Sequence, residues 1–345
     1  MKRRSFLKVV GAASGAYAVN IQPILAAQGA PPAAEKKADA EFPKRVLGRT
    51  GAKISVVGFP GLCLIQYDQK RGTEGIHSAF DRGINYFDIA PAYGNGECET
   101  RMGIGLQGIP RDKIFLSCKT KMRDKDGARK ELENSLTKLK TDHFDLYQMH
   151  HLVKPEEVQK AMGPGGAMET FLKAREEGKV KYFGFSAHTT KGALEALKLF
   201  PQFDTVMFPF NFVEYFLNDS VKNVMETAAA QGAGLIAIKP MSRGTWPKGV
   251  DPTRRWWYRS VEDDLEVRMA WRFTLSQKGM VTGIPPSYLD LLDKAMNAVR
   301  DFRPITEPEM EELKRIAKNT GSIFTREEAM VAMNGHQPGC PYGWA

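Results

Sequence analysis

Cysteine is scarce in this sequence, with four residues in a chain of 345, at positions 63, 98, 118 and 340. They are too few and too scattered for the disulfide framework that holds small secreted domains together. No two of them form a Cys-x-x-Cys pair, so nothing indicates a zinc or iron–sulfur site, and we expect no bound metal. Small buried thiols are the expected state, and a bridge between Cys63 and Cys98 stays open.

Long hydrophobic runs are also missing. No stretch reaches the 18 or so apolar residues that a transmembrane helix needs. Apolar residues make up 42% of the chain and charged residues 26%, which is typical of a soluble globular protein. We therefore expect no stable membrane insertion.

The positive charge is unevenly placed. The formal net charge is +9, but four of the basic residues lie within the first eight positions, and without them the charge is +5. No stripe of Lys and Arg interleaved with aromatic residues follows, so we expect no nucleic-acid binding. A mildly basic pocket for an anionic cofactor is enough to account for the remaining charge.

The N-terminus has the pattern of a signal peptide: a basic start, a short and weakly apolar stretch over residues 9–18, and small residues near Ala26 and Ala27. The run Arg-Arg-Ser-Phe-Leu-Lys at residues 3–8 resembles the twin-arginine export signal, which a receptor reads. That resemblance implies folding in the cytoplasm, contact with the twin-arginine (Tat) export machinery and a periplasmic location; the alternative is a chance basic N-terminus. We assign residues 1–27 to the signal peptide and residues 28–41, which lack apolar periodicity, to a flexible linker.

From about residue 42, short β-rich runs alternate with longer helical patterns. Residues 45–57 predict a hairpin that turns at Thr50-Gly51 and continues into a first barrel strand ending near Gly58. Further strands are expected at 84–88, 114–118, 144–149, 180–185, 205–208, 234–238 and 280–283, and helices around 73–81, 128–140, 168–177 and 221–230. Leu132, Leu136 and Leu139, for example, keep helical spacing on one face.

Repeated strand–helix units imply a parallel sheet covered by helices, and eight of them imply a closed barrel. The alternative, a doubly wound open sheet, normally has a Gly-x-Gly-x-x-Gly turn after its first strand. Here the turn reads Gly58-Phe-Pro-Gly61-Leu-Cys and lacks that pattern. We predict an α/β fold, a single-domain (β/α)8 TIM barrel over residues 42–320, followed by a C-terminal tail, residues 321–345.

Four polar side chains fall at or just after the ends of successive predicted strands: Asp88, Tyr93, Lys119 and His150. Barrel enzymes carry their chemistry on this rim, so we expect the four to lie together. Reduction of a carbonyl needs a proton for the developing alkoxide. Tyr93 is the candidate general acid, with a pKa lowered by the ammonium of Lys119, and Asp88 would keep that lysine charged. His150 would orient the carbonyl and donate a hydrogen bond to its oxygen.

The motifs Asp-x-Ala-x-x-Tyr-Gly, a strand-end Lys, Asp-Leu-Tyr-x-x-His and Gly-Lys-Val-Lys-Tyr-Phe-Gly-Phe-Ser, spread over residues 42–300, together resemble the aldo/keto reductase family. The resemblance implies nicotinamide-dependent interconversion of a small aldehyde or ketone with its alcohol, carried out by the four residues above. It also implies NADP or NAD as the cofactor. Export would favour a nucleotide that is tightly bound before the protein leaves the cytoplasm.

The same resemblance assigns nucleotide binding to Ser186, Asn211, Lys239, Pro240, Met241 and Ser287. The chain departs from the family pattern at several of the neighbouring positions. Ala187 stands where the family has Asn, Met207 where it has Gln, and Ile238 where an aromatic residue stacks on the nicotinamide. No Lys or Arg follows residue 284 until Lys294, so the expected contact to a 2′-phosphate is also missing. The four residues expected to carry the proton transfer are all present, whereas several residues expected to hold the nicotinamide are replaced.

The Lys-Pro-Met and Ser-x-His patterns resemble a bacterial branch of the family in which some members add iron–sulfur cysteines at the C-terminus. Because this tail has only Cys340, no cluster is expected. Trp246, Trp256 and Trp257 either line a substrate pocket or pack their own loop. No large apolar stripe is present, so a monomer is expected. Two alternatives to the enzyme remain: a non-catalytic nucleotide-binding or sensor barrel, and an exported oxidoreductase that takes electrons from a partner protein or a quinone.

Overall fold

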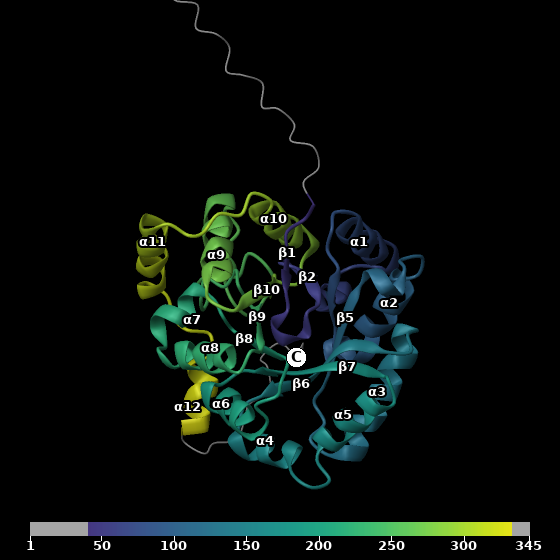
Figure 1. Ribbon diagram of the computed structural model, residues 1–345. Coiled ribbons are helices and arrows are strands. Elements are labelled where there is room, and N and C mark those ends of the chain that lie inside the picture. Colours follow the sequence, from purple (N-terminus) through teal and green to yellow (C-terminus); the bar gives the residue numbers. More distant parts are fainter. Residues whose placement is uncertain (1–40, 333–345) are drawn as a thin grey trace, which may run out of the picture. The chain divides into compact units, whose positions relative to one another are not determined.

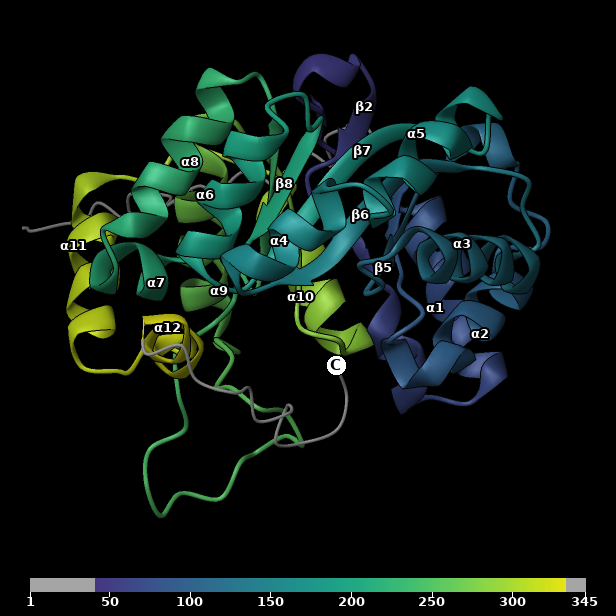
Figure 2. The same cartoon turned by 90° about the horizontal axis from the view of Figure 1, so that it is seen from below.

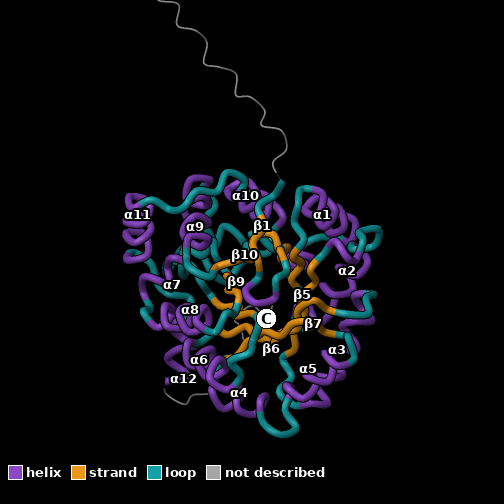
Figure 3. The backbone as a smooth tube through the Cα atoms, in the orientation of Figure 1, coloured by secondary structure: helices purple, strands orange, loops and turns teal. Residues whose placement is uncertain are grey.

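The structure, a computed structural model, describes residues 41–332. Eight strands form one parallel sheet in chain order, and they lie at the centre with helices around them (Figures 1 and 3). They are β3 (Phe59–Pro60), β4 (Tyr86–Asp88), β5 (Phe115–Thr120), β6 (Phe144–Leu152), β7 (Val180–Ala187), β8 (Thr205–Phe208), β9 (Gly234–Ile238) and β10 (Met280–Ile284). The predicted (β/α)8 barrel is confirmed.

The first and last strands close the barrel through the residues just before β3. The amide of Gly58 donates to the carbonyl of Gly283 at 2.9 Å, and the amide of Gly283 donates to the carbonyl of Val56 at 3.1 Å. A side chain at Gly58 would meet Tyr86 and Ile284 at 2.5 Å. This closure therefore requires a residue without a Cβ atom.

The predicted hairpin exists but lies outside the barrel sheet. It consists of β1 (Lys44–Val46) and β2 (Lys53–Ser55), which pair antiparallel. After β2 the chain enters the barrel as predicted, because residues 56–58 pair with β10. The first barrel strand runs past the predicted end at Gly58, since β3 is Phe59–Pro60. Leu47 and Ile54 from the hairpin are fully buried against residues inside the barrel, so the hairpin seals one end of it.

Twelve helices are described: α1 (Gln69–Asp81), α2 (Glu97–Gly105), α3 (Lys125–Leu139), α4 (Pro155–Met162), α5 (Ala167–Glu176), α6 (Thr190–Leu199), α7 (Phe212–Leu217), α8 (Ser220–Ala230), α9 (Asp264–Ser276), α10 (Leu289–Val299), α11 (Glu307–Lys318) and α12 (Thr325–Ala332). Several begin with a capping side chain that accepts a backbone N–H: Asp68, Asp124, Thr189 and Asp263. The predicted apolar face of α3 is buried.

Two hydrophobic clusters hold the barrel together. The larger lies between the sheet and its helices. The smaller one fills the inside of the barrel and includes Tyr86, Leu146, Met207, Ile236 and Val281. Because the interior is packed in this way, ligands have access only at the ends of the strands.

The described part of the predicted C-terminal tail contains a helix. Residues 325–332 form α12, and its Glu328 accepts hydrogen bonds from the backbone and side chain of Thr190 at the start of α6. The loop after β9 projects beyond the strands (Figure 2). The predicted signal peptide, nearly all of the linker, and Cys340 fall outside the described residues.

The three cysteines within the described chain, Cys63, Cys98 and Cys118, are buried free thiols, so Cys63 and Cys98 are not bridged. Within residues 41–332, no helix has both the length and the apolar character to cross a bilayer.

Candidate active site

A buried ion pair lies where β4 and β5 end. Lys119 in β5 is completely buried, and its Nζ lies 2.5 Å from Oδ2 of Asp88 in β4. The same ammonium donates to the carbonyl of Ile89 at 3.1 Å and to the hydroxyl of Tyr93 at 3.2 Å. Each of the three N–H groups of the ammonium thus has an acceptor, as a buried charge requires.

Tyr93 opens the short 3-10 segment Tyr93–Gly96, in which Gly94 and Asn95 have φ of 59° and 52°. Glycine and asparagine adopt this left-handed conformation most readily, so the local sequence suits the turn that places the ring. The Tyr93 ring meets the imidazole of His150 edge to face, with centroids 5.7 Å apart. The structure thereby brings all four predicted residues together.

Burial raises the pKa of Tyr93 well above its usual value, and the carboxylate of Asp88 adds to the rise. The net lowering of this pKa that we expected is therefore not found, because burial outweighs the stabilisation of the phenolate by Lys119. Asp88 lies against the same ammonium and offsets its effect on the phenol. Burial also raises the pKa of Asp88, and Lys119 opposes that rise. Tyr93 keeps its proton at neutral pH, as a general acid requires.

His150 lies near the end of β6 and is 8% exposed. Burial lowers its pKa well below the usual value, and Lys119 and Lys121 lower it further, so the ring is neutral. Its Nδ1 is buried and has no hydrogen-bond partner among the described residues. A buried ring nitrogen without a partner at the barrel rim suits a bound ligand.

The six positions assigned to nucleotide binding lie at or just beyond the ends of β7 to β10. Ser186 accepts a hydrogen bond from the backbone N–H of His151 at 2.9 Å, which leaves its own hydroxyl proton available. Asn211 caps α7 through Oδ1, and its Nδ2 is buried without a partner. A hydroxyl donor and a free amide donor are groups that suit the carboxamide of a nicotinamide.

The other four positions follow β9 and β10. Met241 is fully buried in the larger core, so its side chain does not face the rim, and Pro240 and Ser287 are buried as well. Lys239 has φ of 60° and directs its ammonium over the rings of Trp257 and Phe324. Met207, at the position where the family has Gln, packs inside the barrel and offers no amide to a nicotinamide.

The tryptophans after β9 mainly pack their own loop. Trp246 donates from Nε1 to the carbonyl of Trp256 at 2.9 Å. Trp256 is 9% exposed and clusters with Tyr258 and Phe324. Trp257, under the ammonium of Lys239, is the one of the three that reaches toward the site residues.

Three residues that were not predicted as one group lie together next to His150: His151, His188 and Lys239. The positive charge of Lys121 acts on the same imidazoles and lowers their pKa values. The His151 and His188 rings lie 4.1 Å apart, and Nε2 of His188 is 3.5 Å from Nζ of Lys239. The available signal in the sequence was the doubled histidine at 150–151, together with basic residues after three different strands.

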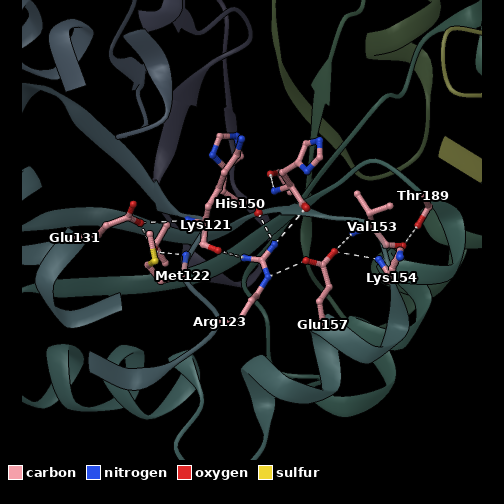
Figure 4. Close-up of polar contacts among 12 residues, drawn as sticks. Lys121, Met122, Arg123, Glu131, His150, Val153, Lys154, Glu157 and Thr189 are labelled. Atoms are coloured by element: carbon pink, nitrogen blue, oxygen red, sulfur yellow. Dashed lines mark hydrogen bonds and ion pairs between the residues drawn. The ribbon is translucent and has the colours of Figure 1, made fainter. Parts of the chain in front are cut away.

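Arg123 ties this rim together (Figure 4). Its guanidinium donates to the carbonyls of His150 at 2.8 Å and His151 at 3.2 Å, and pairs with Glu157 of α4 at 3.1 Å. Glu157 in turn accepts from the backbone of Val153 and of Lys154. The segment after β6 is therefore held from both sides by charge-assisted hydrogen bonds.

With this geometry in view, the model of the aldo/keto reductase family matches residues 65–321. The chain belongs to the aldo/keto reductase family. The conclusion rests on a match across most of the chain, and the resemblance inferred from the motifs is confirmed.

Curated relatives are similar over part of their length. Aldo-keto reductase YhdN of Bacillus subtilis is 32% identical over 168 residues, 45% of this chain and 48% of that protein. L-galactose dehydrogenase of Arabidopsis thaliana is 28% identical over 216 residues, 58% of this chain and 66% of that protein. The chain thus spans about half to two thirds of the length of these relatives.

Solved structures show the same fold. The holo form of an aldo-keto reductase from Bacillus halodurans superposes with a TM-score of 0.64 at 21% identity, covering 84% of this chain and all of that one. A putative aldo-keto reductase from Pseudomonas aeruginosa gives 0.61 at 22% identity, covering 77% and 98%. Residues 41–332 contain no group of histidine, cysteine, aspartate or glutamate side chains that could hold a metal ion.

Proposed function

We propose that this family member reduces an aldehyde or ketone to an alcohol, or runs the reverse reaction, with a nicotinamide nucleotide and with Tyr93 as the general acid. The observation that carries the proposal is the fully buried Lys119 ammonium, which bridges Asp88 and the hydroxyl of Tyr93 beside a neutral His150. An ammonium that donates to a tyrosine hydroxyl stabilises the phenolate left when the proton departs.

In the proposed reaction the carbonyl oxygen lies between Tyr93 and His150. Tyr93 transfers its proton to that oxygen as negative charge develops, and Lys119 stabilises the phenolate that remains. Asp88 keeps Lys119 charged and fixed in place. His150, neutral because of its burial, donates a ring N–H to the same oxygen.

The nicotinamide nucleotide, NADP or NAD, supplies or accepts the hydride when bound. Ser186 and Asn211 are the residues whose free donors fit its carboxamide. Backbone groups of residues 239–241 and the side chain of Ser287, at the ends of β9 and β10, lie on the same rim and would hold the rest of the nucleotide. Tight binding before export is part of the proposal, because a periplasm is not expected to supply free NADPH.

The test is the change Tyr93→Phe, which removes one hydroxyl and keeps the ring. We expect kcat/KM for aldehyde reduction to fall by about 10²–10⁴-fold, the usual contribution of a general acid, with unchanged nucleotide release on denaturation. Tyr182→Phe removes a hydroxyl that bonds to Thr50 at the hairpin and serves as the matched control.

Equal activity of Tyr93→Phe and the unchanged protein would contradict the assigned acid. A protein that releases no nucleotide, binds neither NADPH nor NADH and reduces no aldehyde would contradict the enzyme. The sensor barrel would be supported by nucleotide binding without turnover, and the electron-accepting alternative by aldehyde reduction that depends on a reduced quinone.

We also propose export through the twin-arginine pathway as a folded monomer, on the basis of residues 3–8. Replacing Arg3 and Arg4 by Lys keeps the charge and removes the guanidinium pair. We expect the protein to shift from the periplasmic to the cytoplasmic fraction, with cell fractionation as the measurement. An unchanged distribution of the double variant would contradict this export route, and light scattering of the purified protein checks the monomer.

A further inference from the structure

The two carboxylate oxygens of Asp88 have different partners. Oδ2 pairs with Lys119, whereas Oδ1 accepts a hydrogen bond from the hydroxyl of Tyr86 at 3.5 Å. Tyr86 and Asp88 lie two residues apart in β4, and alternate residues of a strand point to the same face of a sheet. That face is the inside of the barrel, so Tyr86 reaches the carboxylate from the smaller core.

The ring of Tyr86 is tightly packed. It is completely buried, and its centroid lies 5.8 Å from that of Phe115. A Cβ atom at Gly58 would lie 2.5 Å from the same ring, so the chain at Gly58 also lies against it. Because interiors of this density leave a ring little room to turn, its hydroxyl stays directed at Asp88.

A chain of buried polar groups ends at this hydroxyl. Burial raises the pKa of Tyr86 well above its usual value, the charge of Asp88 adds to the rise, and a hydrogen bond from Ser117 opposes it. Ser117 lies opposite Asp88 in the register of β4 and β5, and its oxygen accepts from Nε2 of Gln148 at 2.9 Å. The three side chains thus donate in one direction. Each bond in such a chain strengthens the next one, here the bond to the carboxylate.

The smaller core around Tyr86 is otherwise built mainly from apolar side chains such as Phe115, Leu146 and Ile236. A phenylalanine would fill the same volume as Tyr86. A buried hydroxyl costs free energy unless it is hydrogen-bonded, so this one does not serve packing. Its effect is on the carboxylate of Asp88, which holds a charge in the same apolar surroundings.

The charge state of the ion pair depends on such donors. Burial raises the pKa of Asp88, and Lys119, Tyr86 and Tyr93 oppose the rise. Loss of the Tyr86 hydroxyl would let this pKa rise further, so that the proton of the ion pair would reside more on Asp88 and less on Lys119. A neutral Lys119 would no longer stabilise the phenolate that remains after Tyr93 gives up its proton.

We propose that Tyr86 is a positioning residue of the reaction centre: its hydroxyl keeps the Asp88 carboxylate charged and in place, so that Lys119 stays protonated beside Tyr93. The inference rests on the proposed carbonyl reduction and adds to it a residue that acts from inside the barrel. Tyr86 acts through Asp88 and has no contact with the substrate.

The test is the change Tyr86→Phe, which keeps the ring and its packing. We expect kcat for aldehyde reduction to fall by about three- to tenfold, the usual net contribution of one hydrogen bond, with KM and nucleotide release unchanged. In the Tyr93→Phe background the same change should cause no further loss, because Tyr86 acts on the proton of Tyr93. Tyr147→Phe removes another fully buried hydroxyl, in the larger core, and as the control should leave kcat unchanged.

An unchanged kcat in Tyr86→Phe would overturn the positioning role and leave Tyr93 as the acid. A loss of the same size in the Tyr93→Phe background would overturn it too, since the effect would then not pass through Tyr93.

Carbon-13 NMR of the Asp88 carboxyl, assigned with Asp88→Asn, gives a measurement that needs no turnover. We expect its titration midpoint to lie about 0.5–1 pH unit higher in Tyr86→Phe, the same three- to tenfold effect on the pH scale, and to stay unchanged in Tyr147→Phe. If no aldehyde is reduced with either nucleotide, the carbonyl reduction is contradicted and this titration still decides the role of Tyr86. The same midpoint in Tyr86→Phe and in the unchanged protein would overturn that role.

Discussion

Lys119 and Asp88 form an ion pair that is shielded from water. Both side chains are removed almost completely from water, at 0% and 3% exposure. A buried ion pair rarely adds stability, because the cost of desolvating two charges offsets their attraction. The third contact of Lys119, to the hydroxyl of Tyr93, gives this pair a role that an apolar pair of the same volume could not fill.

His151 makes stability depend on pH. Its pKa is about 3 in the folded protein and near 6.5 when unfolded, so between these values the unfolded chain binds protons more readily. Stability is complete above pH 6.5 and falls as the pH drops toward 3. We expect His151 alone to contribute about 1–2 kcal/mol of loss between pH 7 and pH 5. His150 and His188 act in the same direction.

The variant His151→Asn tests this dependence, since asparagine tolerates the positive φ at this position. Urea unfolding at pH 7 and pH 5 should show a smaller loss than in the unchanged protein. His77→Asn, on α1, is the control and should keep the full loss. A difference between the two pH values that is the same in all three proteins would contradict the assignment to His151.

At the scale of elements, the segment after β6 depends on Arg123. Its guanidinium holds two backbone carbonyls and a carboxylate of α4 at once. Arg123→Met would leave those groups without their partner, and we expect the free energy of unfolding to fall by about 2–3 kcal/mol. Hydrogen exchange at residues 150–154 should become faster, because this segment loses its tether.

Arg123→Lys keeps the charge and should restore part of the stability, but a lysine lacks the planar fork that reaches several acceptors together. Hydrogen exchange over residues 205–208 in β8 serves as an internal control and should not change. If Arg123→Met left the exchange of residues 150–154 unaltered, Arg123 would not be what holds the segment.

The strands themselves were largely predictable. β8 and β9 have the bounds that their apolar runs predicted, whereas β6 and β7 continue two or three residues further. Most of those extra residues are polar or small, such as His150 and Ala187, and have no strand pattern of their own. They belong to the strands because Leu152 pairs with Ala187 beyond an irregularity that contains the positive φ of His151, which is a tertiary cause.

At the scale of the whole barrel, closure depends on Gly58. A Cβ atom there would lie 2.5 Å from the side chains of Tyr86 and Ile284, both packed in the inner core. We expect Gly58→Val to lower the midpoint of urea unfolding by the equivalent of about 1–3 kcal/mol, the usual cost of overpacking. Gly72→Ala in α1 meets only the flexible end of Leu64 and should leave stability unchanged or raise it. Equal effects of the two changes would argue against a closure that depends on Gly58.

The fold class and the four residues at the proposed reaction centre could be predicted from the sequence. Eight alternating units and the rule that barrel chemistry follows strand ends were sufficient, because both depend on local pattern and chain order. The high pKa of Tyr93 and the meeting of His151, His188 and Lys239 depend on the tertiary structure. Burial and the distance between side chains on different strands set those properties, and neither is encoded in the spacing of residues along one strand.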